Sequence, residues 1–374
     1  MGFTPIYMDI FYTFWLVVSC LQLFFWGLFF QRLVWQKMKL NAAKFKKPAV
    51  SIIICARNEA ANLQKNLESI LQQDYPLFEI IIVDDASNDE TRSVVHRLQA
   101  KYNYLKLLRV KQKQQMGKKQ ALRLGIQSSQ YDWLLLTDAD CWPSSNQWVN
   151  KMMQQAQQDQ NSMVLGYGPS WPCPSFLSFW VRYETMLTAI QYFSSAIWKI
   201  PYMGVGRNIM YKKSEYGKFL NFDKHQDLTA GDDDLFVNEA AKANDLSLCI
   251  DSESFMYSMP PAGWLDLVRQ KRRHYSVSHR YQLKHKLLLA TISGSHFLHY
   301  IGIFVFIGSN IWNFNFLVII MMRLLLVVQV FLQFMYKTKQ RRFFGFIFLF
   351  DALLPFYYLF FAPALQTKQI KKWK

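Results

Sequence analysis

The chain is poor in cysteine and has no cysteine pattern. Its five cysteines are scattered and odd in number, and none has the spacing of a metal-binding cluster. We expect reduced, packed thiols in a cytoplasmic domain. Internal repeats and low-complexity segments are missing, and the glycines around Gly117-Lys118 are too few for a P-loop. These absences exclude a disulfide scaffold, a repeat protein and a P-loop enzyme.

The chain has more basic than acidic residues, but its middle part does not. The formal net charge is +17, but residues 49–261 hold 21 Lys and Arg against 23 Asp and Glu. Residues 1–48 carry a net +5, and residues 262–374 carry a net +14. The positive charge therefore flanks the hydrophobic segments, which is typical of a membrane surface. We expect no nucleic-acid partner.

Hydrophobic residues make up 51% of the chain and are segregated into four runs. These runs are Phe11–Phe30, Leu287–Gly308, Phe314–Phe334 and Phe343–Leu365. About 20 apolar residues suffice to cross a bilayer, although each run could also be a buried core helix. The first run lacks a small-residue cleavage site and is predicted to be an anchor. The second contains two histidines and could lie partly in the interface. The last contains Asp351 and Pro355, so it is either a span or a re-entrant hairpin.

The flanking charges predict an orientation. Six Lys and Arg residues follow the first run within residues 32–47, while only Asp9 precedes it. By the positive-inside rule the N-terminus lies outside and residues 40–285 lie in the cytoplasm. We therefore expect an integral protein of the cell's inner or plasma membrane with a cytoplasmic catalytic domain.

The middle of the chain alternates strand and helix patterns. Apolar runs predict strands at residues 49–54, 78–83, 105–110 and 133–136, and helical spacing predicts helices at 58–73, 89–101 and 118–128. Apart from Ser51 and Glu79, the first two strands are apolar and do not alternate, which suits strands covered on both faces. The pattern indicates an open, mostly parallel α/β sheet, in which ligands bind outside the carboxyl ends of the strands.

Polar residues follow three of these strands. The segments are Cys55-Ala-Arg-Asn-Glu59, Asp84-Asp-Ala-Ser-Asn-Asp-Glu90 and Asp138-Ala-Asp140. Each alone could be cap or turn chemistry, but the three are expected to meet at one edge of the sheet. Aspartate oxygens suit hard cations such as Mg²⁺ and Mn²⁺. The last segment therefore predicts a site for a metal–diphosphate.

These motifs resemble those of the family 2 glycosyltransferases. The resemblance rests on Ser51-Ile-Ile-Ile-Cys-Ala-Arg-Asn-Glu59, Ile82-Val-Asp-Asp-Ala-Ser87, Gly117-Lys118 with Ala121-Leu122, and Leu136-Thr-Asp-Ala-Asp140, in that order and spacing. It covers about residues 49–275 and implies a GT-A fold, with a Rossmann-like, mostly parallel sheet. It also implies a nucleotide-sugar donor, most often a UDP-sugar, and a divalent cation (Mg²⁺ or Mn²⁺).

The resemblance assigns the donor-binding residues. It places Ala56 and Glu59 in the nucleoside pocket, Asp84 or Asp85 on the base, Lys118 near the base or the diphosphate, and Asp138 on the nucleotide side. Asp140 is then the direct metal ligand, with Asp138 beside it.

A later acidic motif supplies the candidate base. Thr229-Ala-Gly-Asp-Asp-Asp-Leu-Phe236 resembles the family motif that provides the catalytic carboxylate. Alignment on the glycine selects Asp233, and alignment on the leucine selects Asp232; we favour Asp233. Inverting transfer needs a carboxylate to take the acceptor's proton, and repulsion between adjacent carboxylates can raise a pKa to suit that task. The same acids could simply start a helix.

The segment Arg269–His274 resembles the QxxRW motif of membrane polysaccharide synthases. Gln270 and Arg273 match, while His274 replaces the tryptophan. The resemblance gives Arg273 a role in holding the leaving diphosphate and leaves the stacking role of the tryptophan in doubt. Residues 264–275 also read as a basic amphipathic helix on anionic lipid. Residues 204–210 fall where the family has an acceptor-side glycine loop.

The sequence thus predicts a membrane-anchored, inverting glycosyltransferase. Its expected parts are an anchor and basic linker (1–40), a GT-A domain (41–262), a basic amphipathic interface segment (263–285) and a transmembrane region (286–374) with two or three segments. We expect a lipid or lipid-linked glycan acceptor at the membrane. The alternatives are a processive polysaccharide synthase, a non-catalytic nucleotide-binding scaffold, and a transporter that uses Asp351 and histidines.

Overall fold

The computed structural model describes residues 5–36, 46–113, 117–218, 231, 233–241, 245–309, 314–340 and 344–365. The chain divides into two compact units. One is built from both ends of the chain, Met1–Met38 and Gln282–Gln366, and the other from the middle, Lys39–Tyr281. We call them the helical unit and the catalytic unit. Asp232, one of the two candidate bases, lies outside the described residues.

The catalytic unit contains a seven-stranded sheet in the order β3-β2-β1-β4-β7-β6-β8. The strands are β1 (Val50–Ala56), β2 (Phe78–Asp84), β3 (Leu105–Arg109), β4 (Trp133–Asp138), β6 (Met163–Gly166), β7 (Ile209–Lys212) and β8 (Leu246–Cys249). All neighbouring pairs are parallel except those of β7, which runs antiparallel to β4 and to β6. The predicted mostly parallel sheet and its four predicted strands are confirmed.

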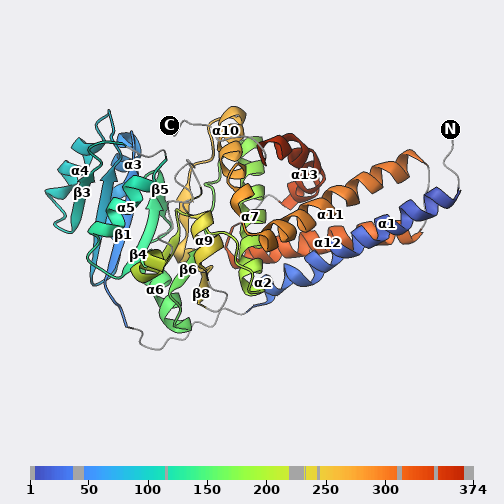
Figure 1. Cartoon of the computed structure of the whole chain (residues 1–374), viewed down its shortest axis with the longest axis horizontal. Helices are drawn as coiled ribbons and strands as arrows, with labels where there is room; N and C mark the ends of the chain where they lie inside the picture. Colours follow the sequence, from blue (N-terminus) through green and yellow to red (C-terminus); the bar gives the residue numbers. More distant parts are fainter. Residues whose placement is uncertain are drawn as a thin grey trace. The chain divides into compact units, whose positions relative to one another are not determined.

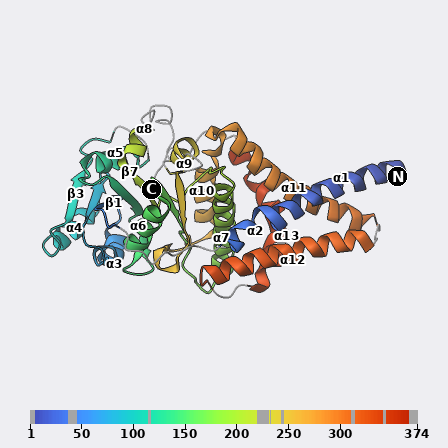
Figure 2. The same ribbon diagram turned by 90° about the horizontal axis from the view of Figure 1, so that it is seen from below.

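Helices cover both faces of this sheet because its strands are apolar on both sides. Ile52, Ile54, Ile80 and Ile82 share a core with α3 (Ala60–Leu71), α4 (Thr91–Gln99) and α6 (Trp148–Asp159). The intervening positions, such as Ile81 and Val83, pack on the other face against α5 (Lys119–Ser128). Figures 1 and 2 show α5 on one side of the sheet and α3 and α6 on the other. The predicted helices 58–73, 89–101 and 118–128 are confirmed.

Further elements follow the first half of the sheet. They are the two-stranded sheet of β5 (Cys141–Pro143) and β9 (Met256–Ser258), and the helices α7 (Phe176–Ile197), α8 (Lys213–Lys218), α9 (Asp234–Ala240) and α10 (Trp264–Tyr275). The segment 264–275 is therefore helical, as its pattern predicts. A lysine of α10 binds a glutamate of α7: Lys271 Nζ lies 2.5 Å from Glu184 Oε1.

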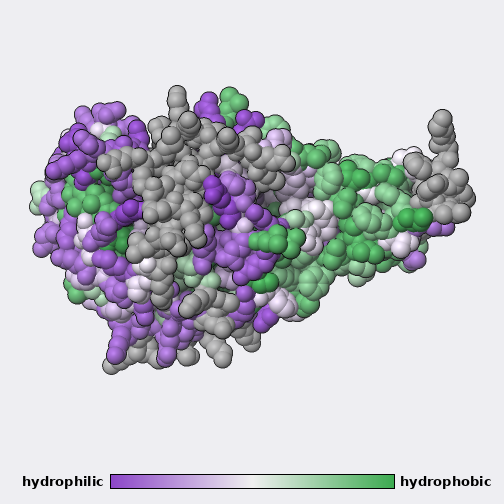
Figure 3. Space-filling view, viewed as in Figure 1, coloured by the Kyte–Doolittle hydropathy of each residue, from purple (hydrophilic) through white to green (hydrophobic). Residues whose placement is uncertain are grey.

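The helical unit consists of apolar helices with exposed hydrophobic side chains. Its elements are α1 (Pro5–Phe24), a π-helical turn (Phe25–Phe29), α2 (Gln31–Trp35), α11 (Leu283–Gly308), α12 (Phe314–Lys337) and α13 (Ile347–Phe361). Three segments are long and apolar enough to cross a membrane: Asp9–Trp35, Leu283–Gly308 and Phe314–Lys337. In Figure 3 hydrophobic side chains cover the visible surface of these helices, and examples such as Val17 and Leu325 are 58% and 63% exposed.

The fourth hydrophobic run has 23 residues, but the helix within it is shorter. Helix α13 has 15 residues, flanked by short 3₁₀ turns. At about 1.5 Å per residue it is roughly 22 Å long, less than the roughly 30 Å of a bilayer's hydrocarbon core. This length favours the re-entrant or interfacial alternative over a full span.

A buried polar network joins the helices of this unit. Arg323 of α12 and Asp351 of α13 are both fully buried and form a two-pronged ion pair, in which Nη2 lies 3.1 Å from Oδ1. The Tyr300 hydroxyl of α11 donates to Asp351 Oδ2 at 2.6 Å. Arg323 Nε donates to Gln22 Oε1 of α1 at 3.1 Å, and Gln22 Nε2 donates to Ser295 at 2.8 Å. Each charged group in this network therefore has several partners, as a buried ion pair requires.

Candidate active site

The carboxyl ends of β1, β2 and β4 meet at one edge of the sheet, as predicted. In the parallel ladders Ala56 pairs with Asp84, and Cys55 pairs with Asp138. The three strand-end motifs therefore lie side by side. In open α/β sheets this edge is where ligands bind.

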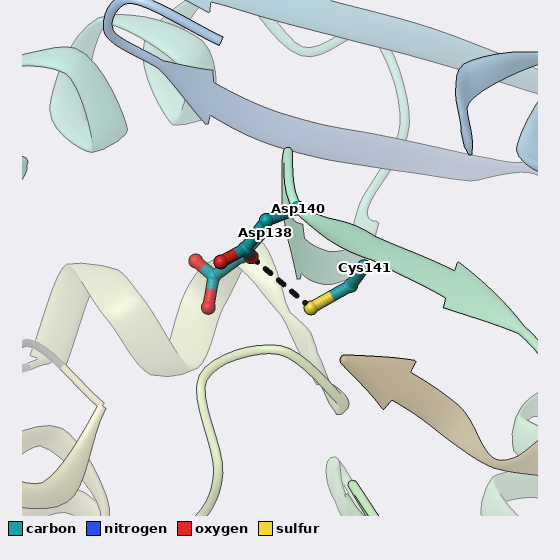
Figure 4. Close-up of side chains that lie close together, drawn as sticks. All are labelled: Asp138, Asp140 and Cys141. Carbon is teal, nitrogen blue, oxygen red and sulfur yellow. Dashed lines mark hydrogen bonds between the residues drawn. The ribbon is translucent and has the colours of Figure 1, made fainter. Parts of the chain in front are cut away.

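Asp138, Asp140 and Cys141 form an acidic cluster at the end of β4. One ligand atom from each lies within 4.8 Å of the others, and the Cys141 thiol is 3.4 Å from Asp140 Oδ1 (Figure 4). Burial raises the pKa of this thiol well above its ordinary value, and the charges of Asp140 and Asp138 raise it further. A thiol sulfur is a soft ligand, whereas carboxylate oxygens suit Mg²⁺ or Mn²⁺, so Asp138 and Asp140 fit the predicted cation.

Lys118 is placed against this cluster by a turn that glycine makes possible. Gly117 has a φ of +73°, a conformation that side-chain-bearing residues adopt with strain. The chain then starts α5, and Lys118 Nζ lies 3.0 Å from Asp138 Oδ1. Partial burial alone would raise the pKa of Asp138, but Lys118, and then Arg207 and Arg273, hold it below its ordinary value. Asp138 is therefore an ionised carboxylate among cations.

The two aspartates that follow β2 have different surroundings. Asp84 Oδ1 accepts the backbone N–H of Ser87 at 3.0 Å, and Oδ2 lies 3.7 Å from Arg92. Asp85 is also fully buried, and its Oδ2 forms an ion pair with the Lys113 ammonium. Among the described residues, Asp85 Oδ1 has no hydrogen-bond partner. Asp84 therefore holds the loop, and each of the two aspartates has one oxygen without a hydrogen-bond partner among the described residues.

Ala56 and Glu59 lie in the loop after β1, next to these aspartates. The Ala56 carbonyl accepts the backbone N–H of Asp85 at 2.8 Å, which joins the two loops. Glu59 is buried, and its Oε2 accepts from the Asn62 amide at 2.5 Å. Both predicted nucleoside-pocket residues therefore sit at the expected edge, and their roles stay predictions.

Asp233 lies at the start of α9 and shares a pocket with the acidic cluster. The backbone N–H of Gly206 donates to Asp233 Oδ2 at 2.6 Å. A Cβ at Gly206 would approach the same oxygen to 2.5 Å, so this contact needs glycine. Lys118, Asp138, Gly206 and Asp233 line one pocket. The structure thus brings a candidate base to the predicted metal site.

Helix α10 brings Gln270 and Arg273 to the catalytic unit, and both are half-buried. Arg273 is close enough to Asp138 to lower its pKa. The neighbouring His274, where the family motif has tryptophan, is reached by solvent but lies in a crowded, cationic region. Burial lowers the pKa of His274 well below its ordinary value, and Arg273, Lys271 and Arg207 lower it further.

Arg207 is a residue that the sequence did not single out. It lies in the glycine-containing segment before β7, which the sequence associates only with the acceptor side. The structure places its guanidinium within electrostatic reach of both Asp138 and His274.

Comparison with known proteins identifies the domain. Residues 51–215 match the family described as Glycosyl transferase family 2. The chain is 35% identical over 106 residues to glycosyltransferase AglE of Haloferax volcanii, covering 28% of this chain and 34% of that protein. It is 30% identical over 138 residues to poly-beta-1,6-N-acetyl-D-glucosamine synthase of Staphylococcus epidermidis, covering 37% and 31%. It is 33% identical over 101 residues to beta-monoglucosyldiacylglycerol synthase of Nostoc sp., covering 26% and 22%. These matches span about a third or less of each relative's length.

A solved structure shares the fold. It is a mannosyltransferase from Pyrobaculum calidifontis in complex with GDP-Man and Mn²⁺, with a TM-score of 0.57 and 14% sequence identity. The likeness covers 93% of this chain and 97% of that one. Residues 51–215 thus match glycosyl transferase family 2, and the mostly parallel seven-stranded sheet is GT-A-like.

Proposed function

We propose that this chain is an inverting glycosyltransferase that moves a sugar from a nucleotide-sugar donor to a lipid or lipid-linked glycan acceptor at the membrane. One observation carries the proposal: Asp138 and Lys118 line the same pocket as Asp233. Metal-binding, diphosphate-binding and proton-accepting groups are therefore within one site. The named relatives include a synthase of a glycolipid and a synthase of a polysaccharide, which supports acceptors of these classes.

The proposed reaction exchanges one bond to the sugar for another. The acceptor oxygen bonds to the anomeric carbon from the face opposite the leaving group, and its proton passes to Asp233. The bond between that carbon and the diphosphate oxygen breaks, and its electron pair stays with the diphosphate. Lys118 and Arg273 offset the negative charge that develops there. Asp232, adjacent in sequence, is the alternative base.

Asp140 and Asp138 would hold a divalent cation. Bound there, Mg²⁺ or Mn²⁺ would act as a Lewis acid toward the donor's diphosphate. The carboxylate donor set supports this assignment, and the mannosyltransferase of similar fold holds Mn²⁺ together with GDP-Man.

The Asp85–Lys113 pair predicts how the donor's base is bound. Asp85 Oδ1 can accept an N–H, and the Lys113 ammonium beside it can donate to a neighbouring acceptor atom. A nucleobase edge that presents an N–H next to an acceptor fits this pair. We therefore expect Asp85→Asn to weaken the binding of UDP and GDP with Mn²⁺ about tenfold, because a neutral amide is a weaker acceptor than a carboxylate. Competition against a fluorescent nucleotide would measure this loss, and an affinity equal to that of the wild type would contradict it.

The function itself is tested with membranes that contain the full chain. They are incubated with a panel of radiolabelled nucleotide sugars and then extracted with organic solvent. We expect label from one donor to enter the lipid fraction. Label in a growing polymer would favour the processive alternative. Mn²⁺-dependent nucleotide binding without any transfer would favour the non-catalytic scaffold.

The membrane location is proposed from the three candidate spans and their basic flanks. The positive-inside rule places the catalytic unit in the cytoplasm. Cytoplasmic placement also gives the enzyme direct access to nucleotide sugars. Protease protection of the catalytic unit in right-side-out vesicles, and its loss in inverted ones, would support this side.

A further inference from the structure

We propose that Arg207 is a further catalytic residue, whose guanidinium contacts the departing diphosphate and neutralises the charge that develops on it. The role rests on the proposed transfer reaction. Arg207 lies in the segment between α7 and β7, outside every motif that suggested a donor-binding residue.

The sheet topology places Arg207 near the predicted metal site. The antiparallel ladder pairs Leu136 of β4 with Ile209, the first residue of β7. Beyond this pair β4 ends at Asp138, and the turn that contains Gly206 and Arg207 precedes β7. The end of β4 and this turn therefore lie at the same edge of the sheet, and Arg207 is close enough to Asp138 to lower its pKa.

The residues on both sides of Arg207 are fixed. Gly206, which precedes it, lines the pocket that contains Asp138 and Asp233. Asn208, which follows it, points into the core, where its side chain accepts from Trp148 Nε1 at 2.9 Å. The amide of Asn208 also donates to the carbonyls of Tyr167 and Ser254, each at 2.8 Å, so the backbone beside Arg207 is firmly held.

The Arg207 guanidinium is anchored to the backbone by one hydrogen bond, and in the described part of the chain some of its N–H donors have no partner. Arg207 Nη2 donates to the Gly168 carbonyl, and a Cβ at Gly168 would overlap the Arg207 side chain. Among the described residues, Arg207 forms no ion pair with a carboxylate, and its buried Nε has no hydrogen-bond partner. A fixed, partly buried guanidinium with unused donors is suited to an anionic ligand, and its fork fits phosphate oxygens.

During the proposed reaction negative charge is lost at Asp233 and gained by the diphosphate, which suits the position of Arg207. When the acceptor's proton reaches Asp233, that carboxylate loses its negative charge, and the departing diphosphate gains one. The adjoining residue, Gly206, donates its N–H to Asp233 Oδ2. Gly206 therefore contacts the carboxylate that becomes neutral, and the next residue, Arg207, contacts the diphosphate that becomes more negative. Stabilisation of the developing charge is the contribution that accelerates the reaction.

The test compares Arg207→Gln and Arg207→Lys with the wild type as full-length protein in detergent. The probes are UDP and GDP with Mn²⁺, measured by calorimetry, and the donor that the membrane panel identifies. We expect Arg207→Gln to weaken nucleoside diphosphate binding about tenfold or more and to lower kcat about 10²-fold. The acceptor KM should stay unchanged. Arg207→Lys keeps the positive charge but not the two-pronged geometry of the guanidinium. Its nucleotide affinity and kcat should lie between those of Arg207→Gln and the wild type.

Arg97→Gln is the matched control, because Arg97 is an exposed arginine on α4 and its loss changes the net charge equally. Melting temperatures check folding, and if Arg207→Gln is unstable the Arg207→Lys variant decides. Nucleotide affinity and kcat equal to those of the Arg97→Gln control would overturn the proposal. An increase confined to the acceptor KM would also overturn it. If the wild type binds nucleotide but transfers no sugar, the proposed function fails, while the binding comparison still tests Arg207.

Discussion

The Asp140→Ala variant is expected to lose Mn²⁺-dependent turnover by at least about 10³-fold. A metal ion contributes several kcal/mol by offsetting charge on the leaving diphosphate, and Asp140 is one of the two carboxylates that can hold it. The exposed position of Asp140 means that its removal leaves the core intact. Calorimetry with Mn²⁺ and UDP or GDP, followed by release of sugar from the identified donor, would measure the loss.

Asp132→Ala is a suitable control for that experiment. Asp132 is an exposed aspartate immediately before β4, so it lies at the opposite end of the same strand from Asp140. The control should keep wild-type binding and turnover. If Asp140→Ala also kept turnover within tenfold of the wild type, the assignment of Asp140 as metal ligand would be wrong.

The Asp351→Leu variant is expected to destabilise the helical unit by about 3–5 kcal/mol, because removal of one partner leaves a buried charge without compensation. Arg323 is fully buried, and its other contacts include the Gln22 side chain at 3.1 Å and the Tyr300 ring at 5.3 Å, neither of which carries the negative charge of a carboxylate. The melting temperature of the full-length protein in detergent should fall by several degrees.

Two further variants separate the charge effect from a packing effect. The double substitution Arg323→Met with Asp351→Leu removes both charges and should recover most of the lost stability, since apolar replacements of a buried pair are often neutral. Leu359→Ala on the same helix removes a side chain that is 55% exposed and should change little. A double variant as unstable as Asp351→Leu alone would show that the loss comes from packing.

The position of most candidate donor residues was predictable because they follow parallel strands. Apolar runs identified the strands, and polar residues after three of them identified the edge. The sequence could not separate Asp84 from Asp85, because adjacent residues after a strand differ only in where the turn directs their side chains. In the structure Asp84 accepts from Ser87 and lies near Arg92, whereas Asp85 forms an ion pair with Lys113.

Arg207 escaped prediction for a topological reason. Strand β7 runs against its neighbours, so the segment at the carboxyl edge precedes this strand instead of following it. A search after each strand misses such a residue. The Arg323–Asp351 pair was also missed, since the sequence showed Asp351 in an apolar run but gave no partner. Pairing between two helices depends on their rotation and packing, which apolar runs do not encode.

The network around Gln22 also has a consequence for the order of synthesis. Gln22 is made early, while its partners Ser295 and Arg323 follow 273 and 301 residues later. At roughly 5–20 residues per second, the ribosome needs roughly 15–60 s to reach Arg323. During that time the whole catalytic unit emerges, and the first apolar helix has none of these polar partners. Its amide therefore stays without these partners until the last helices complete the bundle.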